Sequence, residues 1–160
     1  MLPPILPTTA PRLWFEDLHV GQRFVTDSHT LDAAQIVEFA RVFDPQPFHT
    51  DAVAARETLF GGLAASGWHT AAITMRLLVS SGPPFAAGII GSGGQLTWSQ
   101  PVRAEDVLRV EVEILELTPS RSRPERGMVV IRVETRNQRH EVVQVFSPKL
   151  LVPRRSTAQQ

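Results

Sequence analysis

The stretch Ser66-Gly67-Trp68-His69-Thr70-Ala71-Ala72-Ile73-Thr74-Met75-Arg76-Leu77-Leu78-Val79-Ser80 has the pattern of a helix that is apolar on nearly all sides. Arg76 is its only formally charged residue, so the pattern predicts that the rest of the domain encloses this helix. Its fifteen residues are too few to cross a bilayer, which takes ~20. We therefore expect a buried central helix with a sheet wrapped around it.

Strand patterns occupy much of the remaining chain. Segment 107–117 alternates Leu, Val and Ile with Arg and Glu, which is typical of a strand with one buried face. Further strands are predicted over residues 22–30, 88–100, 128–135 and 142–152. Because the last four strands are joined by short loops, antiparallel pairing is favoured. The expected fold class is α+β, with one hot-dog domain in which an antiparallel sheet wraps around a buried central helix.

Two helices are predicted ahead of the central one. Apolar residues recur at helical spacing over residues 32–43, and a second, short helix is predicted over 51–59. Pro45 and Pro47 lie between these segments. Proline fixes its own φ and disfavours helical geometry in the residue before it, so the prolines predict a stiff, non-helical arm after Phe43.

The arm carries an acid and an imidazole, Asp44 and His49. A carboxylate and a histidine that both reach one water molecule can add that water to a double bond or remove it. The same residues fit a purely structural interpretation, since Asp-Pro commonly ends a helix and Thr50-Asp51 commonly begins one. The residues by themselves leave both interpretations open.

Composition limits the class of protein. With 160 residues, 42% of them hydrophobic, we expect one domain over 13–153, an extended lead-in over 1–12 and a polar, frayed tail over 154–160. Sixteen basic and sixteen acidic residues cancel, so neither nucleic acid nor a membrane is an expected partner. The absence of cysteine excludes zinc-thiolate sites and suits a cytoplasmic protein. The five histidines lack metal-ligand spacing, so no metal site is expected.

Phe43-Asp44-x-Gln46-Pro47-x-His49 resembles the hydratase motif of the MaoC-like dehydratases and R-specific enoyl-CoA hydratases. The similarity extends from residues 14–21 to residues 101–108, where Glu105 replaces a usual glycine. The resemblance implies that Asp44 and His49 together bind the reacting water. Gln46 stands where the family usually has an asparagine that holds the site from the side. The resemblance also implies the hot-dog fold.

The start of the central helix is the expected oxyanion hole. Backbone N–H groups in the first turn of a helix lack intrahelical partners and carry the positive end of the helix dipole, so they can stabilise a negatively charged oxygen. The family usually begins this helix with His-Gly-Met; Gly67 matches the glycine whose amide forms its oxyanion hole, whereas Ser66 and Trp68 depart from the pattern. Ser66 also fits an ordinary N-cap, and the two roles are compatible.

The expected activity is reversible hydration of a 2-enoyl thioester to a 3-hydroxyacyl thioester, with coenzyme A as the expected carrier. No cofactor is expected, because the thioester group itself acts as the electron sink for the reaction. Two alternatives remain: a hot-dog thioesterase, and a non-catalytic acyl-thioester binding protein, which the change at Gln46 keeps open.

The loop arginines Arg121, Arg123 and Arg126 could bind the phosphates of coenzyme A or could simply be solvated. A homodimer or dimer-based oligomer is expected, because a small single sheet leaves a long unpaired edge.

Overall fold

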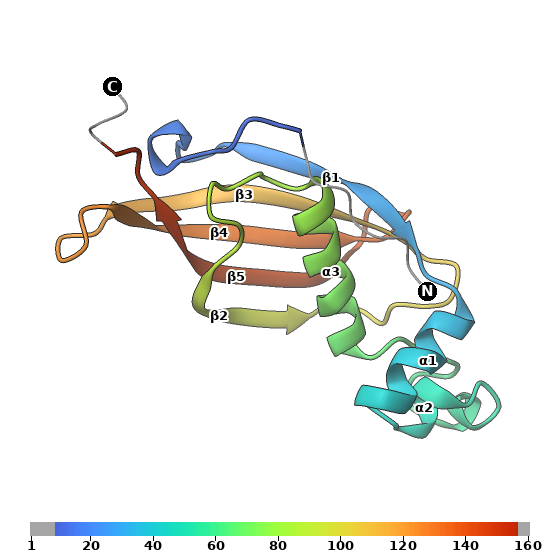
Figure 1. Ribbon diagram of the computed structural model, residues 1–160. Coiled ribbons are helices and arrows are strands. Elements are labelled where there is room, and N and C mark those ends of the chain that lie inside the picture. The colour runs from blue at the N-terminus through green and yellow to red at the C-terminus, as the bar shows by residue number, and fades with distance from the viewer. Residues whose placement is uncertain (1–8, 157–160) are drawn as a thin grey trace.

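A five-stranded antiparallel sheet forms the body of the molecule, with strand order β1-β3-β4-β5-β2 (Figure 1). The computed structural model describes residues 9–156. The strands are β1 (Arg23–Thr30), β2 (Gly91–Trp98), β3 (Val107–Pro119), β4 (Arg126–Arg136) and β5 (Val142–Pro153). The helices are α1 (Ala33–Phe43), α2 (Pro47–Thr50) and α3 (Gly67–Ser81), with short 3-10 turns at Phe15–Asp17 and Ala54–Glu57. The predicted α+β hot-dog arrangement is confirmed.

The core lies between the sheet and α3, which crosses one face of the sheet (Figure 1). The predicted alternation in β3 is confirmed, because Leu108, Val110, Val112 and Ile114 are all buried while the intervening charged residues face away from the helix. The hydrophobic effect therefore fixes which face of the strand turns inward.

Helix α3 is buried on one face only. Its core-facing residues include Ile73, Leu77 and Leu78, whereas Trp68 is 60% exposed and Val79 54% exposed. The prediction of burial on nearly all sides is therefore wrong for the single chain. A single sheet covers one side of a helix, and the other side stays open unless something else packs on it.

The helices before α3 follow the prediction in part. Helix α1 begins after Asp32, whose side chain caps it by accepting a hydrogen bond from the Gln35 amide at 2.8 Å. The predicted non-helical arm is wrong for Pro47–Thr50, which forms one helical turn with Pro47 as its first residue. Proline suits that position because its φ is already helical and its missing N–H would have had no partner there. The short helix predicted over 51–59 is only a 3-10 turn, Ala54–Glu57.

The tail is partly tied to the body of the domain. Residues 1–8 of the predicted lead-in and 157–160 of the predicted tail lie outside the described residues. Arg154 Nε donates to Glu16 Oε1 at 2.9 Å, and Arg155 pairs with Asp17 at 2.7 Å. The expectation of a frayed tail is therefore wrong for these two arginines.

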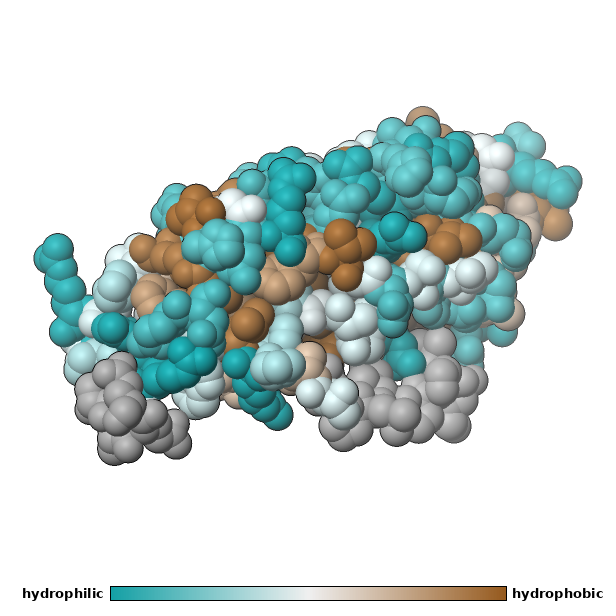
Figure 2. All heavy atoms as spheres, turned by 90° about the horizontal axis from the view of Figure 1, so that it is seen from above, coloured by the Kyte–Doolittle hydropathy of each residue, from teal (hydrophilic) through white to brown (hydrophobic). Residues whose placement is uncertain are grey.

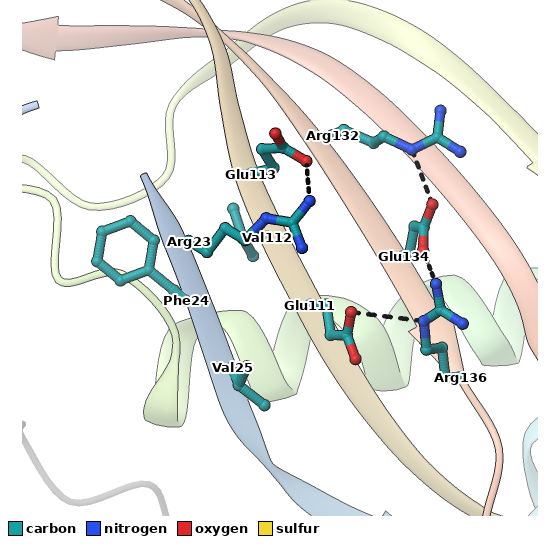
Figure 3. Close-up of a pocket in the computed structure, with 9 residues that line it drawn as sticks. All are labelled: Arg23, Phe24, Val25, Glu111, Val112, Glu113, Arg132, Glu134 and Arg136. Atoms are coloured by element: carbon teal, nitrogen blue, oxygen red, sulfur yellow. Dashed lines mark hydrogen bonds and ion pairs between the residues drawn. The ribbon is translucent and has the colours of Figure 1, made fainter. Parts of the chain in front are cut away.

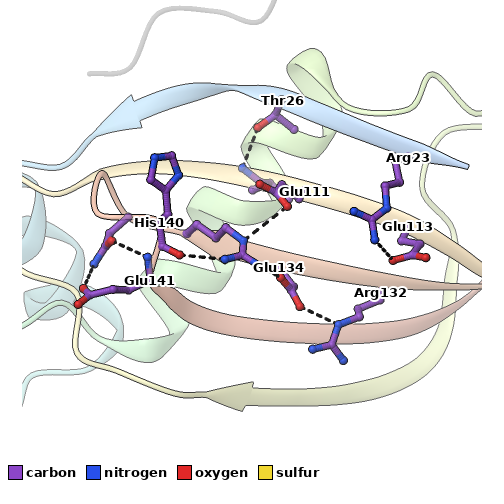
Figure 4. A network of polar contacts seen from close by, with 11 residues as sticks. Arg23, Thr26, Glu111, Glu113, Arg132, Glu134, His140 and Glu141 are labelled. Atoms are coloured by element: carbon purple, nitrogen blue, oxygen red, sulfur yellow. Dashed lines mark hydrogen bonds and ion pairs between the residues drawn. The ribbon is translucent and has the colours of Figure 1, made fainter. Parts of the chain in front are cut away.

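The sheet face opposite α3 carries a network of charges around a hollow of about 320 Å³ (Figures 3 and 4). Arg136 contacts both Glu111, at 3.5 Å, and Glu134, which also pairs with Arg132. Arg23 pairs with Glu113 at 2.9 Å. Three arginines and three glutamates thus neutralise one another, which is typical of a solvated face rather than of a site for a charged ligand.

The side seen from above Figure 1, where β1 forms the edge of the sheet, shows hydrophobic residues in groups among hydrophilic ones (Figure 2). None of the helices in the described part of the chain is long and apolar enough to cross a membrane.

Candidate active site

Asp44 and His49 meet at the end of the molecule where α1 and α2 lie (Figure 1). Asp44 caps the C-terminus of α1, and Pro45 prevents that helix from continuing. His49 lies on the single turn of α2, so its imidazole turns back toward Asp44. Asp44 Oδ2 and His49 Nε2 are 3.3 Å apart, and the two side chains are only 16% and 6% exposed.

Two side chains hold the Asp44 carboxylate in its charged form. Ser66 Oγ donates to Oδ2 at 2.7 Å, and Gln46 Nε2 donates to Oδ1 at 2.7 Å. Burial on its own raises the pKa of Asp44, but these hydrogen bonds, together with the positive charge that His49 has when it is protonated, outweigh it and hold the pKa below its usual value. Asp44 is therefore an anion at neutral pH, and Gln46 supplies a donor beside it.

The position of the proton on His49 follows from its partner. Its Nδ1 lies 2.6 Å from the carbonyl oxygen of Ala64, which can only accept, so Nδ1 carries a hydrogen. In the neutral imidazole, Nε2 then has a lone pair directed toward the Asp44 carboxylate. Two acceptors this close need a donor between them or a proton on one of them. A water molecule has two O–H donors and satisfies both.

The start of α3 is adjacent to this pair. Ser66 caps the helix by accepting a hydrogen bond from the Trp68 amide at 3.2 Å, as the N-cap prediction expects, and it also donates to Asp44, a contact that the sequence did not predict. The N–H of Gly67 enters none of the hydrogen bonds found within residues 9–156. Gly67 and His49 line the same pocket of about 320 Å³, together with Phe60 and Trp98.

A polar network that runs from Gly67 through the half-exposed Trp98 to buried side chains is not evident from the sequence. The Trp98 indole N–H donates to the Gly67 carbonyl and to Gln144 Oε1, each at 3.0 Å. Gln144 Nε2 in turn donates to Thr74 Oγ1 at 3.0 Å, and Thr74 contacts Thr135 at 2.6 Å. The signal available in the sequence is a glutamine inside an apolar strand, Val142-Val143-Gln144-Val145-Phe146.

Gly67 has a packing reason as well as the expected ligand-facing one. A Cβ at this position would lie 2.5 Å from the Trp98 ring, closer than atoms can approach. The indole is held by its two hydrogen bonds and therefore cannot move aside easily. Because residue 67 is glycine, the first turn of α3 can pack directly against the Trp98 ring.

Other expected features lie elsewhere in the chain. The loop that contains Arg121 and Arg123 joins β3 to β4 at the opposite end of the sheet from α1 and α2 (Figure 1), so one chain does not bring it to the Asp44–His49 pair. Within residues 9–156, no three or more His, Cys, Asp or Glu side chains gather as a metal site would require.

Comparison with known proteins shows the family of this chain. The family model described as "MaoC like domain" matches residues 17–138. The chain belongs to the MaoC-like domain family. The matched region begins before β1 and contains all of the site residues described above except Gln144.

The relatives of this MaoC-like protein include one with a named reaction. This chain is 33% identical to a 3-hydroxybutyryl-CoA dehydratase of Methylorubrum extorquens over 112 residues, and the matched stretch covers 69% of each of the two chains. The crystal structure of the MaoC-like dehydratase from Rhodospirillum rubrum is 58% identical, with a TM-score of 0.88 over 90% of this chain and 99% of that one. An R-hydratase from Pseudomonas aeruginosa is 28% identical, with a TM-score of 0.70 over 90% of this chain and 88% of that one.

Proposed function

We propose that this MaoC-like protein is a hydro-lyase that reversibly hydrates a 2-enoyl thioester, with coenzyme A as the carrier. The observation that carries the proposal is the pair of acceptors, Asp44 Oδ2 and His49 Nε2, 3.3 Å apart beside the Gly67 amide, which has no hydrogen-bond partner within residues 9–156. Relatives named as a 3-hydroxybutyryl-CoA dehydratase and an R-hydratase support this class of reaction.

In the proposed hydration, Asp44 and His49 bind one water through its two hydrogens. One of the pair takes a proton as the water oxygen bonds to C3, that proton passes to the other across the 3.3 Å between them, and the second residue delivers it to C2, so both residues end as they began. The π bond between C2 and C3 is lost, and negative charge that develops on the thioester oxygen is stabilised by the Gly67 N–H at the positive end of α3. Dehydration runs the same steps backwards.

Gln46 and Ser66 support the pair without taking part in proton transfer. Both donate to Asp44, each at 2.7 Å, and so favour its anionic form. The Gln46 amide, at the motif position that resembles the family's asparagine, donates to the Asp44 carboxylate. The change from asparagine therefore does not remove the supporting donor, and Pro47 fixes the turn that presents His49.

The domain that carries this activity is proposed to span residues 13–153, since β5 completes the sheet beyond the matched region. The proposed assembly is a dimer, because Trp68, Met75 and Val79 leave an apolar face of α3 exposed and β2 forms an open edge. The proposed location is the cytoplasm, in keeping with the lack of cysteine.

The test is an absorbance assay of enoyl-CoA thioesters from crotonyl-CoA upward, with release of free thiol followed in the same samples. Loss of the conjugated double bond without thiol release is the expected result. Thiol release at a comparable rate would instead identify a thioesterase. Saturable ligand binding with neither signal would identify a binding protein, and a Gln46→Asn variant that gained hydration would then assign the loss to that residue.

A further inference from the structure

His69 is a buried polar residue that the proposed reaction does not use. It lies one helical turn after Ser66 on α3 and is only 8% exposed. Its ring stacks on Phe39 of α1, with centroids 4.4 Å apart and planes within 2° of parallel. The stack fixes the ring at the side of a groove of about 580 Å³ between α1 and the start of α3.

The two ring nitrogens of His69 lie in different surroundings. Nδ1 is enclosed and has no hydrogen-bond partner among residues 9–156. Burial, with a smaller contribution from the charge of His29, lowers the pKa of His69 to about 4, so the ring is neutral at pH 7 and has a single N–H. A buried N–H without an acceptor is rarer than an unpaired acceptor, so the lone pair belongs on Nδ1. The hydrogen then lies on Nε2, the nitrogen that remains open to the groove.

The groove is separate from the pocket that His49 and Gly67 line, but it runs up to the residue before Asp44. Phe43, which lines it, directly precedes Asp44, and its ring contacts Phe39 with centroids 5.0 Å apart. Ser66 bonds to Asp44, and residues three apart on a helix lie about 5–6 Å from each other. With C2 and C3 at the Asp44–His49 pair, an acyl group that passes Phe43 into this groove would bring atoms a few bonds beyond C3 to His69.

The charges around the groove restrict which oxygen would be accepted. Asp32 and Glu38 are both among its lining residues, and no lysine or arginine is. A carboxylate on the acyl group would meet two like charges, which is unfavourable. An uncharged oxygen, as in a hydroxyl or a carbonyl, can accept the Nε2–H without that repulsion.

We propose that His69 determines substrate specificity by donating Nε2–H to an uncharged oxygen on the acyl group, a few bonds beyond C3. The inference rests on the proposed hydratase function and narrows it to oxygen-substituted enoyl thioesters. Its physical basis is that a buried hydrogen-bonding group at the side of a binding groove favours ligands that pair with it.

The test compares kcat/KM for 2-hexenoyl-CoA, its 5-hydroxy and 6-hydroxy derivatives, and 2-hexenedioyl-CoA, which ends in a carboxylate. A neutral hydrogen bond gives about a 2- to 12-fold preference, so one hydroxy derivative should exceed the plain chain by that factor. His69→Leu should remove the preference, and His69→Gln, which keeps a donor, should retain part of it. Val42→Ala is the matched control, because Val42 lines the same groove without a polar group.

Different results separate this inference from the proposed function. Hydration of all substrates with no preference for a hydroxyl, or a preference that His69→Leu keeps, would overturn the role of His69. A best rate with the terminal carboxylate would overturn the choice of an uncharged oxygen. If no thioester is hydrated, the proposed function fails. Calorimetric affinities of hexanoyl-CoA and its hydroxy derivatives for the wild type, His69→Leu and His69→Gln then test the inference by itself, and equal affinities would overturn it.

Discussion

Replacing Asp44 by asparagine is the sharpest test of the proposed chemistry. Asparagine has the same shape, but it lacks the charge and cannot take a proton. At 3.3 Å from His49 Nε2, the carboxylate stabilises a protonated imidazole by about 5 kcal/mol if the effective dielectric constant is ~20. Losing a general acid or base typically costs 10²–10⁴-fold, or about 3–5 kcal/mol. We therefore expect kcat of Asp44→Asn to fall by 10²–10⁴-fold.

The fold should tolerate this change. The asparagine oxygen can still accept from one of its two donors, and the Ser66 hydroxyl can turn to accept from the new amide, so the free energy of unfolding should change by about 1 kcal/mol or less. The assay is hydration of crotonyl-CoA followed by absorbance, together with a urea denaturation curve for each variant.

Asp51→Asn is the matched control. Asp51 lies seven residues along the chain and accepts from the Val53 and Ala54 amides at 2.8 and 3.0 Å, a capping role that asparagine also performs. The Asp51→Asn variant should leave both activity and stability nearly unchanged.

A second check is the Asp44→Asn/His49→Ala double variant, which should be little worse than either single variant because the two residues act as a unit. Activity within tenfold of the wild type in Asp44→Asn, or an equal loss in Asp51→Asn, would refute the assignment.

Three further predictions follow from the same structure. Ser66→Ala removes a hydrogen bond that favours ionised Asp44, so the pKa of Asp44 should rise and the acid limb of the kcat/KM profile should move to higher pH; an unmoved limb would contradict this. Gln144→Leu removes two hydrogen bonds, one from the Trp98 indole and one to Thr74, and should lower the free energy of unfolding by about 1–3 kcal/mol in urea titrations, at about 0.5–1.5 kcal/mol for each bond; an unchanged free energy would mean that these two bonds do not stabilise the fold. Trp68→Glu puts a charge on the exposed face of α3 and should dissociate the proposed dimer in light scattering; a wild-type mass near 17.7 kDa at micromolar concentration would exclude the dimer.

For the wild type, the direction of the pKa shift at Asp44 determines how stability and activity change as the pH is lowered. Because the folded pKa of Asp44 lies below the usual value, its ionisation stabilises the fold at pH values above the unfolded pKa. That contribution is lost as the pH falls through the folded pKa. The wild-type enzyme should therefore keep Asp44 charged, and active, well into the acid range.

Local pattern in the sequence determined much of the fold. The period-two alternation of β3 and the helical spacing of α1 both survive in the structure, because each records which residues must leave water. The Asp44–Pro45 and Gln46–Pro47 pairs likewise mark where one helix ends and the next turn begins. The motif also named Asp44 and His49, and the structure brings them within 3.3 Å of each other.

The sequence was less informative where backbone conformation depends on distant contacts. Glu105, which replaces the family's usual glycine, has a φ of 69° in the left-handed region that favours glycine. Its amide donates to the Leu31 carbonyl at 2.7 Å, a contact from a segment more than seventy residues earlier. No local propensity predicts such a conformation, since the surrounding structure imposes it.

Tertiary structure alone decided the details on which function depends. The tautomer of His49 is set by the Ala64 carbonyl, and the need for glycine at position 67 is set by the Trp98 ring. The apolar composition of α3 could not show that its sheet would cover one face only, and the spacing of His69 could not show that Phe39 would enclose it. Periodicity reports whether a residue is apolar, but burial and hydrogen-bond partners depend on which segments, distant in the chain, pack against it.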